Sequence, residues 1–124
     1  MPDDRVYTVE EADAMLEELR DRLPRIREAR QVMLRHAEIV KERVVADGGG
    51  TSGGREYWAA QATLRSEIER LAEQNIVLRD PETGLINFPG EREGRRVWLC
   101  WRLGEERVGH WHELDSGFRG RKPL

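Results

Sequence analysis

The 124-residue chain is long enough for one domain with a modest core, but too short for two independent cores. Charged residues make up 36% of it and aromatic residues 6%, a composition typical of long solvated helices, and within a net charge of −3 the last third is mildly basic. One cysteine excludes an internal disulfide, and without an export signal or an apolar run of about eighteen residues we expect a soluble cytoplasmic protein.

An apolar seam predicts one long helix over residues 8–46. Its members recur at alternating spacings of three and four, interrupted only by an arginine: Val9, Ala12, Leu16, Leu19, Leu23, Ile26, Arg30, Met33, Ala37, Val40 and Val44. This heptad pattern favours a coiled-coil-like helix that packs along a second helix. Thr8 and Glu11 have the spacing of a capping box, which places the helix start there. Pro24 lies on the flank of the seam, so we expect a kink and not an end.

A glycine-rich segment, residues 47–54, predicts the end of this helix and a flexible tip. We interpret it as a plain connector, because the Gly-Lys-Ser/Thr run of a phosphate-binding loop does not follow it. A second helix is predicted over residues 55–76. Its apolar stripe consists of Tyr57, Leu64, Ile68, Leu71 and Leu78. The two helices would form an antiparallel hairpin.

The predicted helices differ in length, and this difference bears on assembly. The second helix, about 33 Å long, covers only the part of the first helix that follows Pro24. Leu16, Leu19 and Leu23 therefore need another cover, which is either the C-terminal third of the chain or a second copy of the protein. We expect self-association through this uncovered start, giving a homodimer or a higher homo-oligomer.

The rest of the chain predicts a small antiparallel meander of three or four strands, so the fold class is α+β. Its segments are a first hairpin (residues 77–79 and 85–88), a polar loop (90–94), a second hairpin (95–103 and 107–114) and an irregular tail (115–124). If the second hairpin has a two-residue turn, the two strands place these residues on one face: Val97, Leu99, Trp101, Leu103, Val108, His110, His112 and Leu114. The other face then carries Trp98, Cys100, Trp111 and Glu113. With a three-residue loop, each residue of the last strand would lie on the opposite face instead.

Two histidines of the last predicted strand are candidate metal ligands. His110 and His112 are one residue apart, so both point the same way, about 7 Å from each other. A third ligand would have to come from His36, Glu113 or Asp115. The alternative, which we favour, is that both histidines lie at the edge of an apolar face and hydrogen-bond to the backbone or to an acid. A divalent metal is therefore a possible cofactor and not the expected one.

Cys100 and the basic residues near it allow two further hypotheses. Cys100 could act as a nucleophile, but the sequence shows no recognisable oxyanion hole, so a buried structural cysteine is favoured. Nucleic acid could bind a face made of Arg96, Arg102, Arg107, Arg119, Arg121, Trp98 and Trp111. The acidic residues Glu105, Glu106, Glu113 and Asp115 dilute that face. An ordinary solvated sheet surface is therefore the favoured interpretation.

Several runs of the chain are similar to a known family. They are YTVEEA at residues 7–12, GLINFP at 84–89, VWLCWRLGE at 97–105, WHELDSGF at 111–118 and RGRKPL at 119–124. Together they resemble a bacterial family catalogued as domain of unknown function 2203, over nearly the whole chain. The resemblance implies no activity, because no biochemistry is assigned to that family.

The resemblance does single out positions. Those that match its motif are Cys100, Trp101, Gly104, Glu105, Trp111, His112, Glu113, Asp115, Gly117, Phe118 and Arg121. His110 stands where an aromatic such as tyrosine is more usual, which weakens the two-histidine metal site, and Asn87 stands where aspartate is expected. The resemblance therefore points to a cluster of Trp111, His112, Glu113, Asp115 and Arg121, with Trp101 and Glu105 nearby.

These observations predict a non-enzymatic binding or interaction protein. Its helical hairpin would mediate self-association, and its sheet and tail would form the recognition surface. The first alternative is a metal-dependent or acid–base enzyme that uses Trp111, His112 and Glu113; the second is weak nucleic-acid binding. No membrane partner is expected, and the sequence identifies no small-molecule ligand.

Overall fold

The computed structural model describes residues 5–47 and 54–124, and the side chains of all of these except residues 43–47. Two helices, α1 (Val9–Asp47) and α2 (Arg55–Glu73), precede an antiparallel sheet. Its strands are β1 (Val77–Asp80), β2 (Leu85–Arg92), β3 (Arg95–Arg102), β4 (His110–His112) and β5 (Lys122–Pro123), in that spatial order. The predicted α+β class is confirmed, with one strand more than expected because part of the tail pairs with β4.

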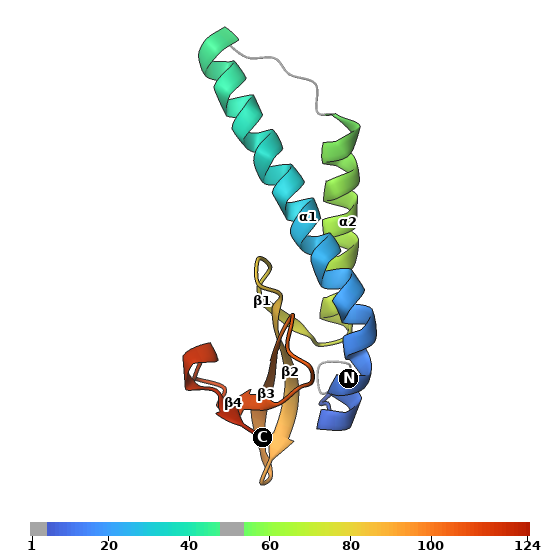
Figure 1. Ribbon diagram of the computed structural model, residues 1–124, viewed down its shortest axis with the longest axis vertical. Coiled ribbons are helices and arrows are strands. Elements are labelled where there is room, and N and C mark those ends of the chain that lie inside the picture. The colour runs from blue at the N-terminus through green and yellow to red at the C-terminus, as the bar shows by residue number, and fades with distance from the viewer. Residues whose placement is uncertain (1–4, 48–53) are drawn as a thin grey trace.

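The helices form an antiparallel pair, and Figure 1 shows them side by side with the sheet beside the first part of α1. The predicted capping box is present, because the Thr8 N–H donates to Glu11 Oε1 (2.8 Å) and the Glu11 N–H donates to Thr8 Oγ1 (3.0 Å). α1 runs through Pro24 without ending. Within the described residues, neither helix combines the length and the apolar character needed to cross a membrane. The predicted glycine-rich tip and the Val44 side chain lie outside the described part of the chain.

α2 ends three residues earlier than predicted, at a Schellman motif. Asn75 has φ +60°, the Asn75 N–H donates to the Ala72 carbonyl (3.0 Å), and the Ile76 N–H donates to the Leu71 carbonyl (3.0 Å). Ile76 and Leu71 are both buried, which is the hydrophobic contact that accompanies this motif. The helix therefore stops at Glu73 although the apolar periodicity continues beyond it.

The sheet covers the start of α1, and the expectation of an uncovered helix is wrong. Leu16, Leu19 and Leu23 are at most 2% exposed. They share one core with apolar side chains of the sheet, among them Phe88 and Trp101. The C-terminal third of the same chain thus supplies the cover, and self-association through these leucines is not expected. Whether the protein associates through another surface stays a prediction.

The β2–β3 hairpin replaces the polar loop predicted at residues 90–94. β2 and β3 pair continuously from Leu85↔Arg102 to Arg92↔Arg95, around a two-residue turn in which Glu93 (φ 52°) and Gly94 (φ 79°) both have positive φ. Gly90 is a buried residue of β2. A Cβ at this position would lie 2.8 Å from Leu99 Cγ, which is too close for any residue with a side chain. Close packing against Leu99, and not a turn, therefore explains this glycine.

The last hairpin also differs from the expected arrangement. β4 is only three residues long, and its register pairs Trp98 with His112, Leu99 with Trp111 and Cys100 with His110. The assignment of residues to faces that assumed a two-residue turn is wrong for β4. Residues 103–109 form a longer connection, so each residue of β4 lies on the face opposite to the one predicted. Trp111 consequently lies on the face toward α1, the core face, and both histidines lie on the opposite, outer face. The tail, predicted to be irregular, contains a 3-10 turn (Phe118–Gly120) and β5.

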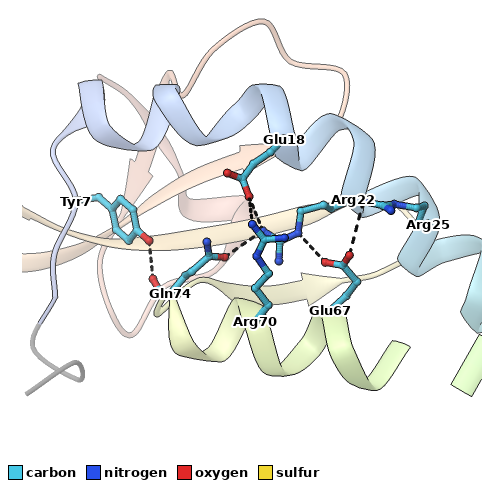
Figure 2. A network of polar contacts seen from close by, with 7 residues as sticks. All are labelled: Tyr7, Glu18, Arg22, Arg25, Glu67, Arg70 and Gln74. Atoms are coloured by element: carbon cyan, nitrogen blue, oxygen red, sulfur yellow. Dashed lines mark hydrogen bonds and ion pairs between the residues drawn. The ribbon is translucent and has the colours of Figure 1, made fainter. Parts of the chain in front are cut away.

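A buried arginine joins the two helices (Figure 2). The side chain of Arg22 is 2% exposed; its Nε donates to Glu67 (2.6 Å) and its Nη1 donates to Glu18 (2.9 Å) and Gln74 (3.1 Å). Two exposed arginines also belong to the network: Arg70 pairs with Glu18, and Arg25 pairs with Glu67. The network fixes the position of α2 along α1 directly beside the sheet. Sequence reasoning missed it, because Arg22 lies next to the predicted apolar seam and not within it.

Candidate functional site

A pocket of about 370 Å³ lies on the outer face of the sheet, and we call it the outer pocket. Its lining residues come from the four strands β1 to β4 and from the segment after β4: Arg79, Leu85, Asn87, Cys100, His112, Leu114, Asp115, Ser116, Gly117 and Phe118. The C-terminal segment, red in Figure 1, lies beside the sheet there. The pocket brings together five of the positions that match the family motif: Cys100, His112, Asp115, Gly117 and Phe118.

Arg79 is held in place at the wall of this pocket. Asn87, which is 1% exposed, orients its amide so that its oxygen accepts from Arg79 Nε (2.9 Å) and its nitrogen donates to the Ile86 carbonyl (3.1 Å). The guanidinium also lies over the Trp98 ring, 5.2 Å from its centroid. Across residues 5–47 and 54–124, no protein group accepts a hydrogen bond from the terminal nitrogens of Arg79. A guanidinium fixed in this way is suited to bind a carboxylate or a phosphate.

His112 contributes a second polar group with a defined tautomer. The ring is 2% exposed, and its Nδ1 lies 2.9 Å from the Glu113 carbonyl oxygen. Because a carbonyl oxygen can only accept, Nδ1 must carry the hydrogen. In the neutral ring, Nε2 is therefore the atom with a lone pair, and it is the one left for a ligand in the pocket.

Cys100 forms part of the pocket lining as a neutral thiol. Burial raises the pKa of Cys100, although the Arg121 guanidinium, whose Nη1 lies 3.8 Å from the sulfur, opposes this effect. A thiol with a raised pKa is a poor nucleophile at pH 7. The geometry therefore favours the structural interpretation of Cys100 over the catalytic one.

An ion pair fixes the C-terminal segment that covers the pocket. Arg121 binds Glu105 through two hydrogen bonds (2.5 and 3.2 Å), and Glu105 also accepts from the Arg102 N–H (2.9 Å). The Phe118 ring lies 4.2 Å from the Arg121 guanidinium carbon. Burial alone would raise the pKa of Glu105, but the hydrogen bonds from Arg121 and Arg102 outweigh it and hold that pKa below the ordinary value.

Glu105→Gln is therefore expected to lower the free energy of unfolding at pH 7 by about 2 kcal/mol, the contribution of hydrogen bonds to a charged group. Since the pKa of Glu105 is lower in the folded protein, the loss should be complete above the ordinary value of 4.5 and should disappear as the pH falls through the depressed value. Urea denaturation from pH 7 down to pH 3 measures it. Glu106→Gln, at an exposed neighbour, is the control and should change little. A loss for Glu105→Gln that is independent of pH would contradict this assignment.

The predicted cluster around His112 is divided between two faces of the sheet. Trp101 and Trp111 belong to the core. Glu113 pairs with Arg95 (2.5 Å), whose hydrogen bond lowers the pKa of Glu113. Only His112 and Asp115 line the outer pocket, while Glu105 and Arg121 anchor its cover.

The metal and nucleic-acid hypotheses gain no support from the geometry. His110 and His112 share a face, but in the described part of the chain no group of three or more His, Cys, Asp or Glu side chains is placed to hold a metal ion. His36, a suggested third ligand, packs against Tyr57 in the helical hairpin (4.5 Å between centroids). Trp98 and Trp111 lie on opposite faces of the sheet, so the proposed basic and aromatic residues do not form one surface.

Sequence reasoning missed Arg79 and Asn87 as partners. The register pairs Val77 with Asn87 and shifts between Leu78 and Asp80, so Arg79 lies at an irregularity of β1, where its Nε reaches the Asn87 amide. Only the pairing of β1 with β2 would have indicated that the two residues are neighbours, and residue types alone do not determine that pairing.

Comparisons with known proteins identify the family but no activity. A family model described as an uncharacterised conserved protein (DUF2203) matches residues 5–124. Searches of curated proteins and of solved structures found no match. The match covers essentially the whole chain, as the resemblance of the sequence motifs implied. The chain therefore belongs to the DUF2203 family.

Proposed function

We propose that this protein binds a small anionic molecule, a carboxylate or a phosphate ester, in the outer pocket. The observation that carries the proposal is Arg79, whose guanidinium is fixed by Asn87 and Trp98 while its terminal nitrogens stay available to a ligand. The volume of about 370 Å³ falls in the range of small-molecule sites. His112 Nε2 and the Asp115 carboxylate can accept hydrogen bonds from hydroxyl or amino groups, so the molecule would carry such a group beside its anion.

Arg79→Gln should weaken binding of such a molecule at least about tenfold, because hydrogen bonds to a charged group contribute about 1.5–3 kcal/mol. A panel of hydroxycarboxylates and sugar phosphates can be screened by thermal shift, and the dissociation constants measured by calorimetry. Arg107→Gln is the matched control, since Arg107 is an exposed arginine outside the pocket. The proposal fails if no member of the panel binds, or if Arg79→Gln binds as tightly as the wild type.

An acid–base enzyme is the second candidate, supported by the fixed tautomer of His112. Turnover of a bound panel member would favour it, provided that His112→Gln abolishes turnover and leaves the dissociation constant nearly unchanged. If the bound molecule is recovered unaltered, the protein is a binding protein.

We also propose that the far part of the helical hairpin is a contact surface for a second copy of the chain. Three large apolar side chains are exposed there: Leu34 (52%), Ile39 (46%) and Trp58 (60%). A neighbouring groove of about 260 Å³ between the helices is lined by the buried Ala29 and Ala60 and by both signs of charge, from Arg25, Glu28 and Glu56. A reversed second copy is complementary to such a groove.

Static light scattering at micromolar concentration tests this contact. We expect a dimer mass for the wild type and a monomer mass for Trp58→Ser, with Ile68→Ser as a control at an exposed apolar position nearer the sheet. A wild type that is monomeric at these concentrations would refute the contact.

A further inference from the structure

The lining of the outer pocket carries one charge of each sign, from Arg79 and Asp115. Cys100 lines the pocket as a neutral thiol, and the neutral ring of His112 adds no charge. The charges of the lining therefore sum to zero. A ligand with one negative and one positive group matches this lining, whereas a phosphate ester would bring about two negative charges to a wall with a single guanidinium.

The two charges of the lining do not neutralise each other. Within residues 5–47 and 54–124, the Asp115 carboxylate has no hydrogen-bond or ion-pair partner, although the carboxylates of Glu105 and Glu113 on either side are each paired with an arginine. Arg79 uses its Nε for Asn87 and keeps its terminal nitrogens for a ligand. Both charges are therefore open to a molecule that lies between them.

The rest of the lining includes an apolar wall formed by Leu85, Leu114 and Phe118. Leu114 is 55% exposed, so its side chain gains little from the protein itself and would gain from contact with an apolar ligand group. The pocket volume, about 370 Å³, is near the lower end of the range for small-molecule sites, which is about 300–1,000 Å³. The wall and the volume therefore suit a short apolar group.

On the basis of the proposed anion binding at Arg79, we infer that the outer pocket binds a free amino acid with an apolar side chain. The amino-acid carboxylate would bind the terminal nitrogens of Arg79. The ammonium group, which has three donors, would donate to the Asp115 carboxylate and to His112 Nε2. The side chain would lie against Leu114 and its neighbours in the apolar wall.

L-Leucine and its hydroxy analogue, L-leucic acid, are matched probes, because they differ only in that a hydroxyl replaces the ammonium group. Calorimetry at pH 7 should show leucine binding at least about tenfold more tightly, since a hydrogen bond between charged groups contributes more than one from a hydroxyl. Asp115→Asn should remove this preference by weakening leucine while it binds leucic acid like the wild type. Asp21→Asn, the same change at an exposed position of α1, should keep the preference.

Glycine tests the contribution of the apolar wall. The wild type should bind leucine at least about tenfold more tightly than glycine, because the leucine side chain leaves water. Leu114→Ser should reduce this difference and leave the binding of glycine nearly unchanged.

The outcomes separate this inference from the proposed function. If leucic acid binds as tightly as leucine, if Asp115→Asn keeps the wild-type preference, or if glycine binds as tightly as leucine, the inference is overturned, while anion binding at Arg79 stands. If neither leucine nor leucic acid binds, both the inference and the binding of carboxylates in the outer pocket are overturned.

Discussion

Trp101→Ala is expected to lower the free energy of unfolding by about 4 kcal/mol, as is typical when a fully buried tryptophan is truncated. The side chain is 0% exposed and lies in the core between the sheet and α1. Its indole N–H donates to the Glu105 carbonyl (3.1 Å), and Arg20 lies over the ring. The substitution therefore leaves a large cavity and a carbonyl without its donor. Urea denaturation followed by circular dichroism measures the loss.

Ile68→Ala is the control for this experiment, because Ile68 is 41% exposed on α2 and lies outside the surface proposed to contact a second copy. Its effect should stay within about 0.5 kcal/mol, as for other surface substitutions. If the two alanine variants were equally stable, the sheet would not be packed on the start of α1, and the cover of Leu16, Leu19 and Leu23 would have to come from elsewhere.

Arg22→Ala should lower the free energy of unfolding by about 3 kcal/mol, because it leaves carboxylates without their buried partner. The Glu67 side chain is only 12% exposed and accepts from Arg22 Nε at 2.6 Å (Figure 2). Arg25→Ala removes an exposed partner of the same carboxylate and should cost no more than about 0.5 kcal/mol. Chemical denaturation of both variants at pH 7 gives the comparison.

A double variant separates the burial of charge from the packing of the helices. Arg22→Met combined with Glu67→Met removes both charges and keeps apolar volume, so it should recover most of the stability that Arg22→Ala loses. Equal stability of Arg22→Ala and Arg25→Ala would show instead that the network does not hold α2 against α1.

Local patterns were sufficient to predict the two helices and most of the sheet, but not β5, the continuous β2–β3 hairpin or the arrangement around the pocket. The heptad seam and the pair Thr8 and Glu11 depend only on neighbours in sequence, and the helix and its cap are confirmed. The faces of β4 depend on the length of the connection at residues 103–109, which no residue type fixes. An error of one residue in that register moves His112 from one face of the sheet to the other.

The candidate site depended on contacts between distant segments. Asn87 and Arg79 meet because β1 pairs with β2, and the segment containing Asp115 covers them because Arg121 binds Glu105. His112, Asp115 and Arg121 were identified from the family motif, whereas the arginine that carries the proposed binding was not. Gly90 illustrates the same difficulty, since its role is to accommodate Leu99 on a neighbouring strand.

The most direct test of the binding proposal is a nuclear magnetic resonance titration of the ¹⁵N-labelled protein with inorganic phosphate. We expect saturable shifts of the Arg79 Nε–H and the His112 ring resonances, with the same dissociation constant, and no such shift of Arg107. In Arg79→Gln, the His112 response should weaken about tenfold. A response that does not saturate, or one equally large at Arg107, would contradict anion binding in the outer pocket.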